Sequence, residues 1–457
     1  MKLGVLPLGR STFDMPFAEA RLTAMLAALE AGGGALCGPR HLLLEADAAA
    51  AAMDEVLAAA PELMLVLQVT FTDAGFVARL AGATDLPIAI WAPPEPRLGG
   101  RLRLNALCGL NLASHALGRI GRRFSYLYAD PEAAGEALGE LLAGGRRVAP
   151  RNGTASGAAP LREPLAPIRI ARIGAHPEGF DTCRSDPGDL IRRTGADVDD
   201  LELATLFDTA RTLPETDLAP IRSRTKAQLP NLGDLDAGEV DRSLRLAGAL
   251  QTLRATGAYD GFAIRCWPET FTQYGGAVCG PVSMMGEARV PCACEADVHG
   301  AATLVLLQRL SGEAVFLVDL VDLDAADDTA VVWHCGQAPV SMADPEAEMR
   351  ATVHTNRKQA LLYEFPLKPG RVTFFRLSQA LDSPKVVVAG GEMLRRAPAF
   401  TGTSGVVRFD HPAPMILKDL MDTGMEHHMA LAYGDHRATL ASLAAALDLP
   451  LVELGHA

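Results

Sequence analysis

The chain has 457 residues, of which 49% are hydrophobic and 21% are charged, a composition typical of globular proteins and unlike that of disordered or fibrous chains. One hydrophobic core rarely serves a chain of this length, so two or three domains are expected. The formal net charge of −13 argues against nucleic acid as the main partner, because binding to phosphates needs a basic face.

Two features bear on where the protein works. No apolar run reaches the roughly 18 residues that a membrane-spanning helix needs, so no membrane partner is expected. The first residues, MKLGVLPLGRSTFD, lack the long apolar core of a signal peptide, which predicts a cytoplasmic location. The eight cysteines form no CxxC pair and mostly lie in apolar strings, so we expect buried, reduced thiols.

The first 145 residues alternate short apolar runs with Ala/Leu-rich helical patterns, as in a parallel α/β sheet. Asp14 is the expected cap of a helix over 17–31. Because ligands approach the carboxyl ends of parallel strands, Gln68 and Trp91 are candidate substrate contacts. No GxGxxG follows a strand, so a dinucleotide cofactor has no support.

After residue 145, the composition and the expected secondary structure change twice. Residues 146–166 are rich in Pro, Gly, Ser and Arg and predict a linker, after which PIRIARIG begins a second α/β unit with helices at about 199–213 and 236–256. From about Ala314, strand-like runs separated by turns predict an antiparallel sheet or small barrel, followed by a final helix. The expected domains are two α/β units and a β-rich C-terminal unit, over 1–160, 161–312 and 313–457.

Three carboxylates lie within about thirty positions, between the apolar segments GFAIRCW and AATLVLLQRL: Glu269, Glu295 and Asp297. A carboxylate at the end of an apolar strand is costly to desolvate unless it is paired or bound to a cation. Glu269 is expected on a loop at a strand end, as an ion ligand or a base for proton transfer. Glu295 and Asp297 would share one face of a strand, and capping of the next helix by Asp297 is the alternative.

Histidines follow downstream. His334, in VVWHCGQAP, is either a ligand or substrate contact or a core histidine; of His427 and His428, one is expected to face a metal. Asp319, in the apolar run VFLVDLVDLD, is expected inside. Carboxylates with imidazoles on irregular backbone suit Mn²⁺, Co²⁺, Mg²⁺ or Zn²⁺. Metal-assisted chemistry on a polyol or carbonyl fits this set better than a nucleophilic triad or a glycosidase.

With these residues placed, the chain resembles the L-fucose isomerase/L-arabinose isomerase family over nearly its full length. The segments that carry the resemblance, in order, are NALCGLNLASHALGRIG, RIGAHPEGFDTC, AIRCWPET, CACEADVHGAATLVLLQRLSG, VVWHCGQAP and EHHMAL. The resemblance implies two Rossmann-like α/β domains followed by the β-rich domain. It also implies a homo-oligomer, as a dimer, trimer or hexamer, in which neighbouring subunits contribute to the site.

The resemblance further implies a divalent cation, Mn²⁺ first, held by Glu269, Asp297 and His428, with His334 as a second choice. The implied reaction is aldose–ketose isomerisation through an enediol, with a hexose, a deoxy-hexose or a modified sugar, such as a sulfonated one, as substrate. Glu269 would take the C2 proton, and Asp297 would bind the metal and assist the proton shift between oxygens. The neighbouring Glu295 is an alternative ligand or a substrate contact.

Further substrate contacts are expected from Trp91, Trp267 and Tyr274, with core packing as the alternative reading of each. An anionic substituent would be met by arginines in loops, although such arginines are usually solvated: Arg40, Arg97, Arg101, Arg103 and Arg184. The second hypothesis for function is a non-catalytic sugar-binding or regulatory protein on the same scaffold. The sequence has no helix-turn-helix segment, which weighs against a repressor.

Overall fold

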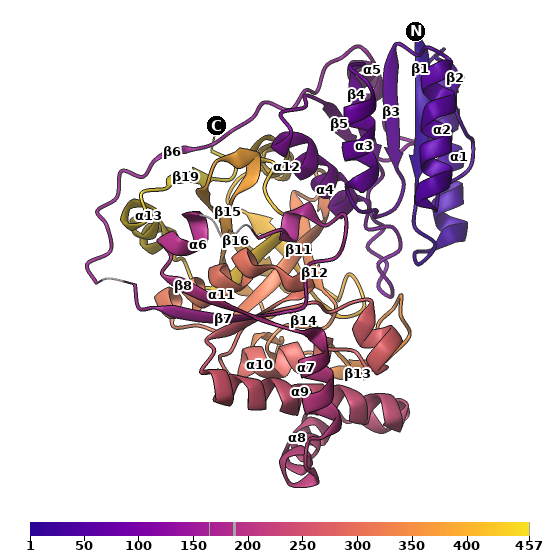
Figure 1. The fold of residues 1–457 in the computed structure, drawn as a ribbon. Coiled ribbons are helices and arrows are strands. Elements are labelled where there is room, and N and C mark those ends of the chain that lie inside the picture. Colours follow the sequence, from indigo (N-terminus) through magenta and orange to yellow (C-terminus); the bar gives the residue numbers. More distant parts are fainter. Residues whose placement is uncertain (164, 186–188, 457) are drawn as a thin grey trace.

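The computed structural model describes residues 1–163, 165–185 and 189–456, which form a mixed α/β molecule (Figure 1). Two parallel sheets come first along the chain, and a larger, mostly antiparallel sheet follows. The expected fold class, two α/β units followed by a β-rich unit, is confirmed. Within the described ranges, no helix is long and apolar enough to cross a membrane.

The first sheet is parallel, with the strand order β2-β1-β3-β4-β5. Its strands are β1 (Lys2–Leu8), β2 (Ala35–Cys37), β3 (Leu63–Gln68), β4 (Ile88–Ala92) and β5 (Ser125–Tyr128). The helices are α1 (Met15–Ala31), α2 (Ala46–Ala58), α3 (Gly75–Ala83), α4 (Ala106–Arg119) and α5 (Gly135–Leu142). Every residue of β3 and β4 is buried, which explains why these strands read as continuous apolar runs. Asp14 caps α1 as expected, because its carboxylate accepts from the amide of Phe17.

The second sheet is also parallel, with the order β10-β9-β7-β8. Its strands are β7 (Ile168–Ile173), β8 (Ala196–Leu201), β9 (Gly261–Ile264) and β10 (Cys292–Ala293). The helices are α6 (Asp189–Arg193), α7 (Leu203–Arg211), α8 (Glu215–Gln228), α9 (Ala237–Gly257), α10 (Cys279–Glu287) and α11 (Val298–Ser311). The helix expected from about 199 begins only at Leu203, because the preceding ADVDDL forms β8. This strand lies at the sheet edge, where its aspartates reach solvent.

The third sheet has the order β13-β14-β17-β12-β11-β18-β15-β16-β19-β6, and β16 also pairs with β17. The strands from β17 to β16 in this order therefore close on themselves, as the expected small barrel would. The strands are β11 (Val315–Asp324), β12 (Thr329–His334), β13 (Arg350–Thr352), β14 (Leu362–Pro366), β15 (Gly370–Ser378), β16 (Lys385–Leu394), β17 (Thr403–Phe409), β18 (His428–Tyr433) and β19 (Pro450–Glu453).

Three details of this region differ from expectation. Helix α12 (Ala413–Thr423) interrupts the strands, and β19 follows the expected final helix, α13 (Arg437–Ala446). The short strand β6 (Thr154–Ala155), inside the expected linker, pairs with β19 at the edge of the sheet. The residues up to 163 therefore lead from the first sheet to the edge of the third (Figure 1).

A buried ion pair joins the first sheet to the third. Arg97, in the loop after β4, donates from Nε to Oδ2 of Asp322 on β11 at 2.6 Å and from Nη1 to the hydroxyl of Thr329 at 2.7 Å. The hydroxyl of Tyr128, at the end of β5, donates to Oδ1 of Asp322 at 2.6 Å. Burial raises the pKa of Asp322, and the charge of Arg97 acts against this shift. This contact fixes the position of the loop after β4, which also carries residues that line the pocket.

The substitution Asp322→Asn tests this contact. It leaves the largely buried guanidinium of Arg97 without a counter-charge, and we expect a loss of about 3 kcal/mol in the free energy of unfolding, measured by urea denaturation. Asp85→Asn is the control, because Asp85 is fully exposed and its ion pair with Arg122, at 3.7 Å, is longer and solvated. This substitution should leave the free energy of unfolding unchanged. Equal stability of the two variants would contradict the proposed role of the pair.

Candidate metal centre and sugar pocket

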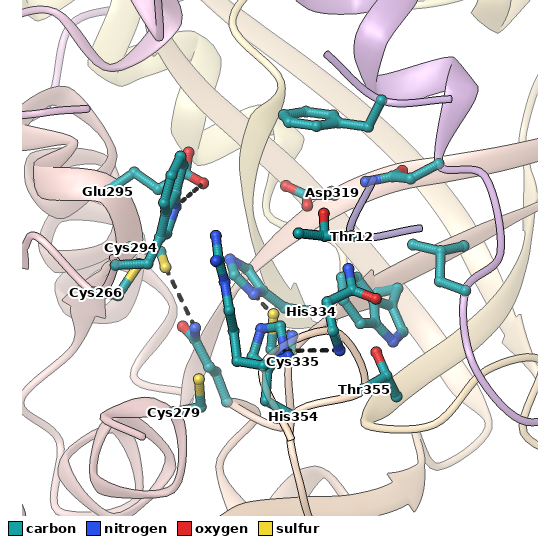
Figure 2. Close-up of a pocket in the computed structure, with 18 of the residues that line it drawn as sticks. Thr12, Cys266, Cys279, Cys294, Glu295, Asp319, His334, Cys335, His354 and Thr355 are labelled. Carbon is teal, nitrogen blue, oxygen red and sulfur yellow. Dashed lines mark hydrogen bonds between the residues drawn. The ribbon is translucent and has the colours of Figure 1, made fainter. Parts of the chain in front are cut away.

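A pocket lies where the three sheets meet, and its lining side chains come from all of them (Figure 2). The first sheet contributes loop residues that include Phe13 and Asn105, and the second contributes Trp267 and Glu295. The third contributes Asp319, His334 and His427. Carboxylates and imidazoles from distant parts of the sequence therefore face one pocket.

Glu295 is presented to this pocket by an unusual stretch of backbone. It lies in a single 3₁₀ turn, Cys294–Ala296, between β10 and α11, and its φ of +58° is left-handed. Ala296 is also left-handed, with a φ of +55°. Non-glycine residues adopt this conformation at a cost that is commonly found at functional sites. The turn is followed at once by Asp297, which caps α11 by accepting from the amide of Gly300 at 2.8 Å.

Asp297 also orients His428, the first residue of β18. The Nδ1 atom of His428 lies 3.0 Å from Oδ2 of Asp297, so Nδ1–H donates to the carboxylate and Nε2 is left as an acceptor. That Nε2 lies 4.0 Å from Oε2 of Glu295 and 3.6 Å from Oδ1 of Asp319. A carboxylate behind an imidazole is the usual arrangement of a metal-binding histidine, because it fixes the tautomer and the ring orientation.

Arg376, on β15, holds Asp297 in turn. Its guanidinium donates to both carboxylate oxygens of Asp297, at 2.6 and 3.1 Å, and both side chains are buried. Its Nε lies 3.6 Å from Oε2 of Glu426, which is also buried. Burial raises the pKa of Asp297, but the charge of Arg376 and the hydrogen bond to His428 outweigh it and hold that pKa well below its usual range. Asp297 is therefore an anion that supports His428 from behind.

Asp319 is placed by strand pairing. In the register of the third sheet it lies directly opposite His428 on β18 and opposite Trp333 on β12. Its Oδ1 atom is buried and accepts no hydrogen bond from any residue that the structure describes. An unsatisfied buried carboxylate oxygen is costly unless a ligand or a cation meets it.

His334 has a different orientation. Its Nδ1 accepts from the amide of Cys335 at 2.9 Å, so Nε2 carries the proton in the neutral ring. That Nε2 is also buried without a partner among the described residues. His334 therefore offers the pocket a hydrogen-bond donor rather than a metal-binding lone pair.

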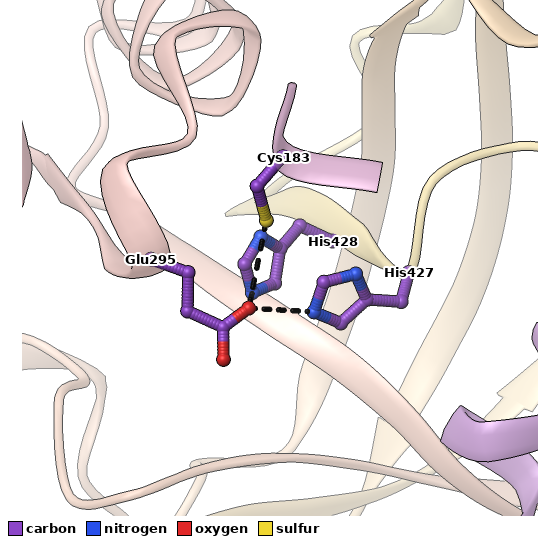
Figure 3. A group of neighbouring side chains, drawn as sticks. All are labelled: Cys183, Glu295, His427 and His428. Atoms are coloured by element: carbon purple, nitrogen blue, oxygen red, sulfur yellow. Dashed lines mark hydrogen bonds and ion pairs between the residues drawn. The ribbon is translucent and has the colours of Figure 1, made fainter. Parts of the chain in front are cut away.

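His427 completes the group around Glu295 (Figure 3). Its Nε2 lies 3.2 Å from Oε2 of Glu295, and Oε1 of Glu295 accepts from the indole N–H of Trp267 at 3.1 Å. Cys183 donates to Oε2 at 3.5 Å. Burial raises the pKa of Glu295, but the hydrogen bond and charge of His427 and the charge of His428 outweigh it and lower the pKa to about 2. Glu295 is therefore anionic at neutral pH.

These residues fit a divalent cation. Two groups of ligand atoms, each within 4.8 Å of one another, share His428: Cys183, Glu295, His427 and His428 in one group, and Asp319, His334 and His428 in the other. The unsatisfied Oδ1 of Asp319 and the outward-facing Nε2 of His428 are the atoms that an ion would satisfy. Two carboxylates with one imidazole suit Mn²⁺, Co²⁺, Mg²⁺ or Zn²⁺.

The structure places Glu269 elsewhere and does not support it as a ligand. Its carboxylate is paired with Arg265 through two hydrogen bonds, of 2.6 and 2.8 Å, and one-fifth of its side chain is exposed. The hydrogen bond from Arg265 is the main cause that lowers its pKa. Arg265 and Glu269 lie four positions apart but not on one helix, so no helical periodicity in the sequence indicates this pair. Asp297, the other expected ligand, faces away from the pocket towards Arg376.

The expected substrate contacts divide in two. Trp267, Glu295 and His334 line the pocket. Trp91, Tyr274 and Gln68 do not, because each is buried against its own domain. Trp91 lies in β4 and donates to the carbonyl of Ala129. Tyr274 stacks on Phe207 with ring centroids 5.2 Å apart, and the amide of Gln68 donates to Thr70 and Thr72.

Some lining residues were not singled out from the sequence. His354, Asn105, Arg10 and Arg357 lie in irregular segments, whose meeting in space has no periodic signal. The arginines that the sequence offered for an anion are not among the lining residues of the described chain. Three of them bind carboxylates instead, namely Arg40 on Glu30, Arg97 on Asp322 and Arg103 on Asp14.

Comparison with known proteins identifies the family. Residues 4–147 match the family model described as the fucose/sulfoquinovose isomerase N-terminal domain, and residues 332–455 match the L-fucose isomerase C-terminal domain. The chain is 31% identical to a sulfoquinovose isomerase of Alkalicoccus urumqiensis over 98% of both chains. It is 30% identical to one of Priestia megaterium over 97% of both, and 28% identical to one of a Clostridium species over 98% of both.

These matches, together with the fold, define a sugar isomerase. The chain belongs to the fucose/sulfoquinovose isomerase family, and the expected class of enzyme is confirmed. The expected homo-oligomer, the cytoplasmic location and the domain boundaries stay predictions.

The loop from β4 to α4 reaches the pocket through Asn105 and is tied down by Glu95. The carboxylate of Glu95 accepts from three consecutive amides, those of Arg103, Leu104 and Asn105, at 2.5, 2.8 and 2.9 Å. Burial is the main cause that raises the pKa of Glu95 to about 7, and the charge of Asp322 adds to it. The position of Asn105 therefore depends on a carboxyl group that titrates near neutral pH.

Glu95 should make stability depend on pH. Its pKa is about 7 in the folded protein and 4.5 for a glutamate side chain in water, so the folded state binds the proton more tightly. The corresponding stability is full below pH 4.5 and is lost as the pH rises to about 7, by about 3 kcal/mol in total. Glu95→Gln should abolish this part of the slope in urea unfolding at pH 5 to 8. An unchanged difference between wild type and variant across that range would contradict the assignment.

Proposed function

We propose that the chain is a divalent-metal-dependent aldose–ketose isomerase whose substrate is a sulfonated sugar of the sulfoquinovose type. The observation that carries the proposal is the position of His428, whose Nε2 faces Glu295 and Asp319 at 4.0 and 3.6 Å while Asp297 holds its Nδ1. The sulfonated substrate is supported by the relatives that match along nearly the whole chain, which are named sulfoquinovose isomerases.

In this proposal Glu295, Asp319 and His428 hold the cation, with Mn²⁺ as the first choice. When bound, such an ion polarises the carbonyl and the adjacent hydroxyl of the open-chain sugar and makes the C–H proton between them more acidic. Asp297 keeps His428 in the tautomer whose Nε2 lone pair faces the pocket.

The isomerisation moves one proton between C2 and C1 and another between the two oxygens, through an enediol. Oε2 of Glu295 takes the proton from C2 of the aldose and returns it to C1, since this carboxylate is anionic at neutral pH. Asp319 accepts and returns the hydroxyl proton through the carboxylate oxygen that the cation leaves free. Apolar walls that include Phe13 and Phe180 keep water from these transfers.

Two further side chains orient the sugar. The Nε2–H of His334 donates to a sugar oxygen, and the side-chain carbonyl of Asn105 accepts from a hydroxyl. Both atoms are buried and lack partners in the part of the chain that the structure describes. These two contacts provide one donor and one acceptor to a substrate that carries several hydroxyl groups.

Removal of the metal should abolish the reaction. We expect a chelator to stop the conversion of sulfoquinovose to its 2-ketose, followed by NMR, and Mn²⁺ or Co²⁺ to restore it. The same ions should raise the Tm of the chelated protein, because they bind the folded state only. Glu295→Gln should weaken that Tm increase. Full turnover in a protein shown to be metal-free would refute metal dependence.

The proposed function and the expectation from the sequence name different carboxylates, Glu295 and Glu269, and a pair of isosteric substitutions separates them. Glu295→Gln should lower kcat by about 10²- to 10⁴-fold, because it removes the proton acceptor. Glu269→Gln should keep kcat close to the wild-type value, because Glu269 pairs with Arg265 at a partly exposed site. A large loss of kcat in Glu269→Gln, with normal turnover in Glu295→Gln, would restore the sequence-based assignment.

A further inference from the structure

Two arginines that line the pocket lie close to the ring of one tryptophan. Arg10 follows β1, and Arg357 lies in the loop between β13 and β14; both line the pocket. Their guanidinium carbons lie 5.7 and 5.5 Å from the centroid of the Trp267 ring. The N–H of the same indole donates to Glu295. The indole of Trp267 therefore contacts both cations and also Glu295, the carboxylate that the proposed function assigns to proton transfer.

Among the residues that the structure describes, the guanidinium of Arg357 has no anionic partner. Across residues 1–163, 165–185 and 189–456, no carboxylate lies within ion-pair distance of it and no hydrogen bond from it is formed. It is partly buried, and burial together with the charge of Arg10 lowers its pKa. A partly desolvated cation beside another cation is unfavourable unless a ligand supplies negative charge.

The loop around Arg357 is built to hold this position. Nδ1 of His354 accepts from the amides of Asn356 and Arg357, at 3.2 and 3.3 Å, and the ring packs edge-on against Phe271. Burial, with the charge of Arg357, lowers the pKa of His354 to about 3, so this imidazole stays neutral and keeps its acceptor. Arg101 ties the loop to the first domain by donating to Asn356 and to the carbonyl of Thr12.

The charge at this end of the pocket suits a monoanion. Arg10 is already paired with Asp73 at 2.9 Å, so two guanidiniums and one carboxylate leave a single net positive charge. A sulfonate carries one negative charge, whereas a phosphate monoester carries about 1.5 to 2 at pH 7. A guanidinium also presents several N–H donors that match the oxygens of a tetrahedral anion.

We propose that Arg357, assisted by Arg10, forms the subsite that binds the sulfonate of the substrate and makes the enzyme select a sulfonated sugar over its neutral analogue. This inference rests on the proposed function, because it assumes that the other end of the sugar reacts at Glu295. Arg357 is the specificity-determining residue of the pair, because Arg10 is also engaged in an ion pair with Asp73.

Kinetics with two substrates test the subsite. Sulfoquinovose and quinovose differ only in the sulfonate on C6. Arg357→Gln should lower kcat/KM for sulfoquinovose by about 10- to 100-fold, mainly through KM, and leave kcat/KM for quinovose unchanged. Arg357→Lys should recover part of the loss. Arg350→Gln is the matched control, because Arg350 precedes the same loop but is exposed and pairs with Glu348; it should behave as wild type. Equal losses on both sugars, or none, would overturn the subsite.

A binding measurement separates this inference from the proposed function. The methyl glycoside of sulfoquinovose cannot open its ring and therefore cannot isomerise, so its Kd reports the subsite alone. Calorimetry should give tighter binding than for methyl quinovoside or glucose 6-phosphate, and Arg357→Gln should remove the preference. Arg357-dependent binding without any turnover of sulfoquinovose would retain the subsite and refute the proposed function. Turnover of sulfoquinovose by a wild-type protein that binds the sulfonated glycoside no tighter than methyl quinovoside, or less tightly than glucose 6-phosphate, would retain the proposed function and refute the subsite.

Discussion

The buried pairing of Arg376 with Asp297 is the contact on which the site depends. Asp297 makes three kinds of contact at once: it caps α11, it accepts from Arg376 and it accepts from Nδ1 of His428. These contacts join the turn that follows β10 of the second sheet to strands of the third sheet. Glu295 lies in that turn, two residues before Asp297. If Asp297 lost its charge, the cap, the buried guanidinium and the tautomer of His428 would all be affected together.

Such a buried ion pair is a poor source of net stability, because desolvation offsets most of the attraction. Its value here lies in geometry. Arg376 donates to both oxygens of Asp297 and reaches Glu426, so neither carboxylate can rotate freely. His428 inherits this fixed position, and the register of β11 with β18 places Asp319 opposite it. A site assembled from three distant segments therefore has little freedom to rearrange, which is what proton transfer over short distances requires.

The sequence predicted the buried strands well, because strands such as β3 and β4 are continuous apolar runs, but it missed the acidic edge strand β8. It also predicted that acidic residues near Glu295 would meet the histidines near His428. It could not rank the acids. Glu269 is favoured in the sequence because it follows an apolar strand, but it pairs with Arg265. Glu295 reaches the pocket through a left-handed turn, which no pattern of apolar residues in the sequence predicts. Asp319 was visible as an acid inside an apolar strand, but its partner was not, because pairing of β11 with β18 is a long-range contact.

The two ends of the pocket rest on different kinds of structure. Glu295, Asp319 and His428 are held by a buried ion pair and by strand register, whereas Arg10 and Arg357 sit on loops at the rim of two sheets. Loops tolerate substitution far better than a packed sheet does. The proposed anion subsite can therefore change without disturbing the proposed reacting end, although Trp267 contacts both. With the anion subsite at the proposed place, this division would allow one scaffold to serve both neutral and sulfonated sugars, the two kinds named in the description of the matching family.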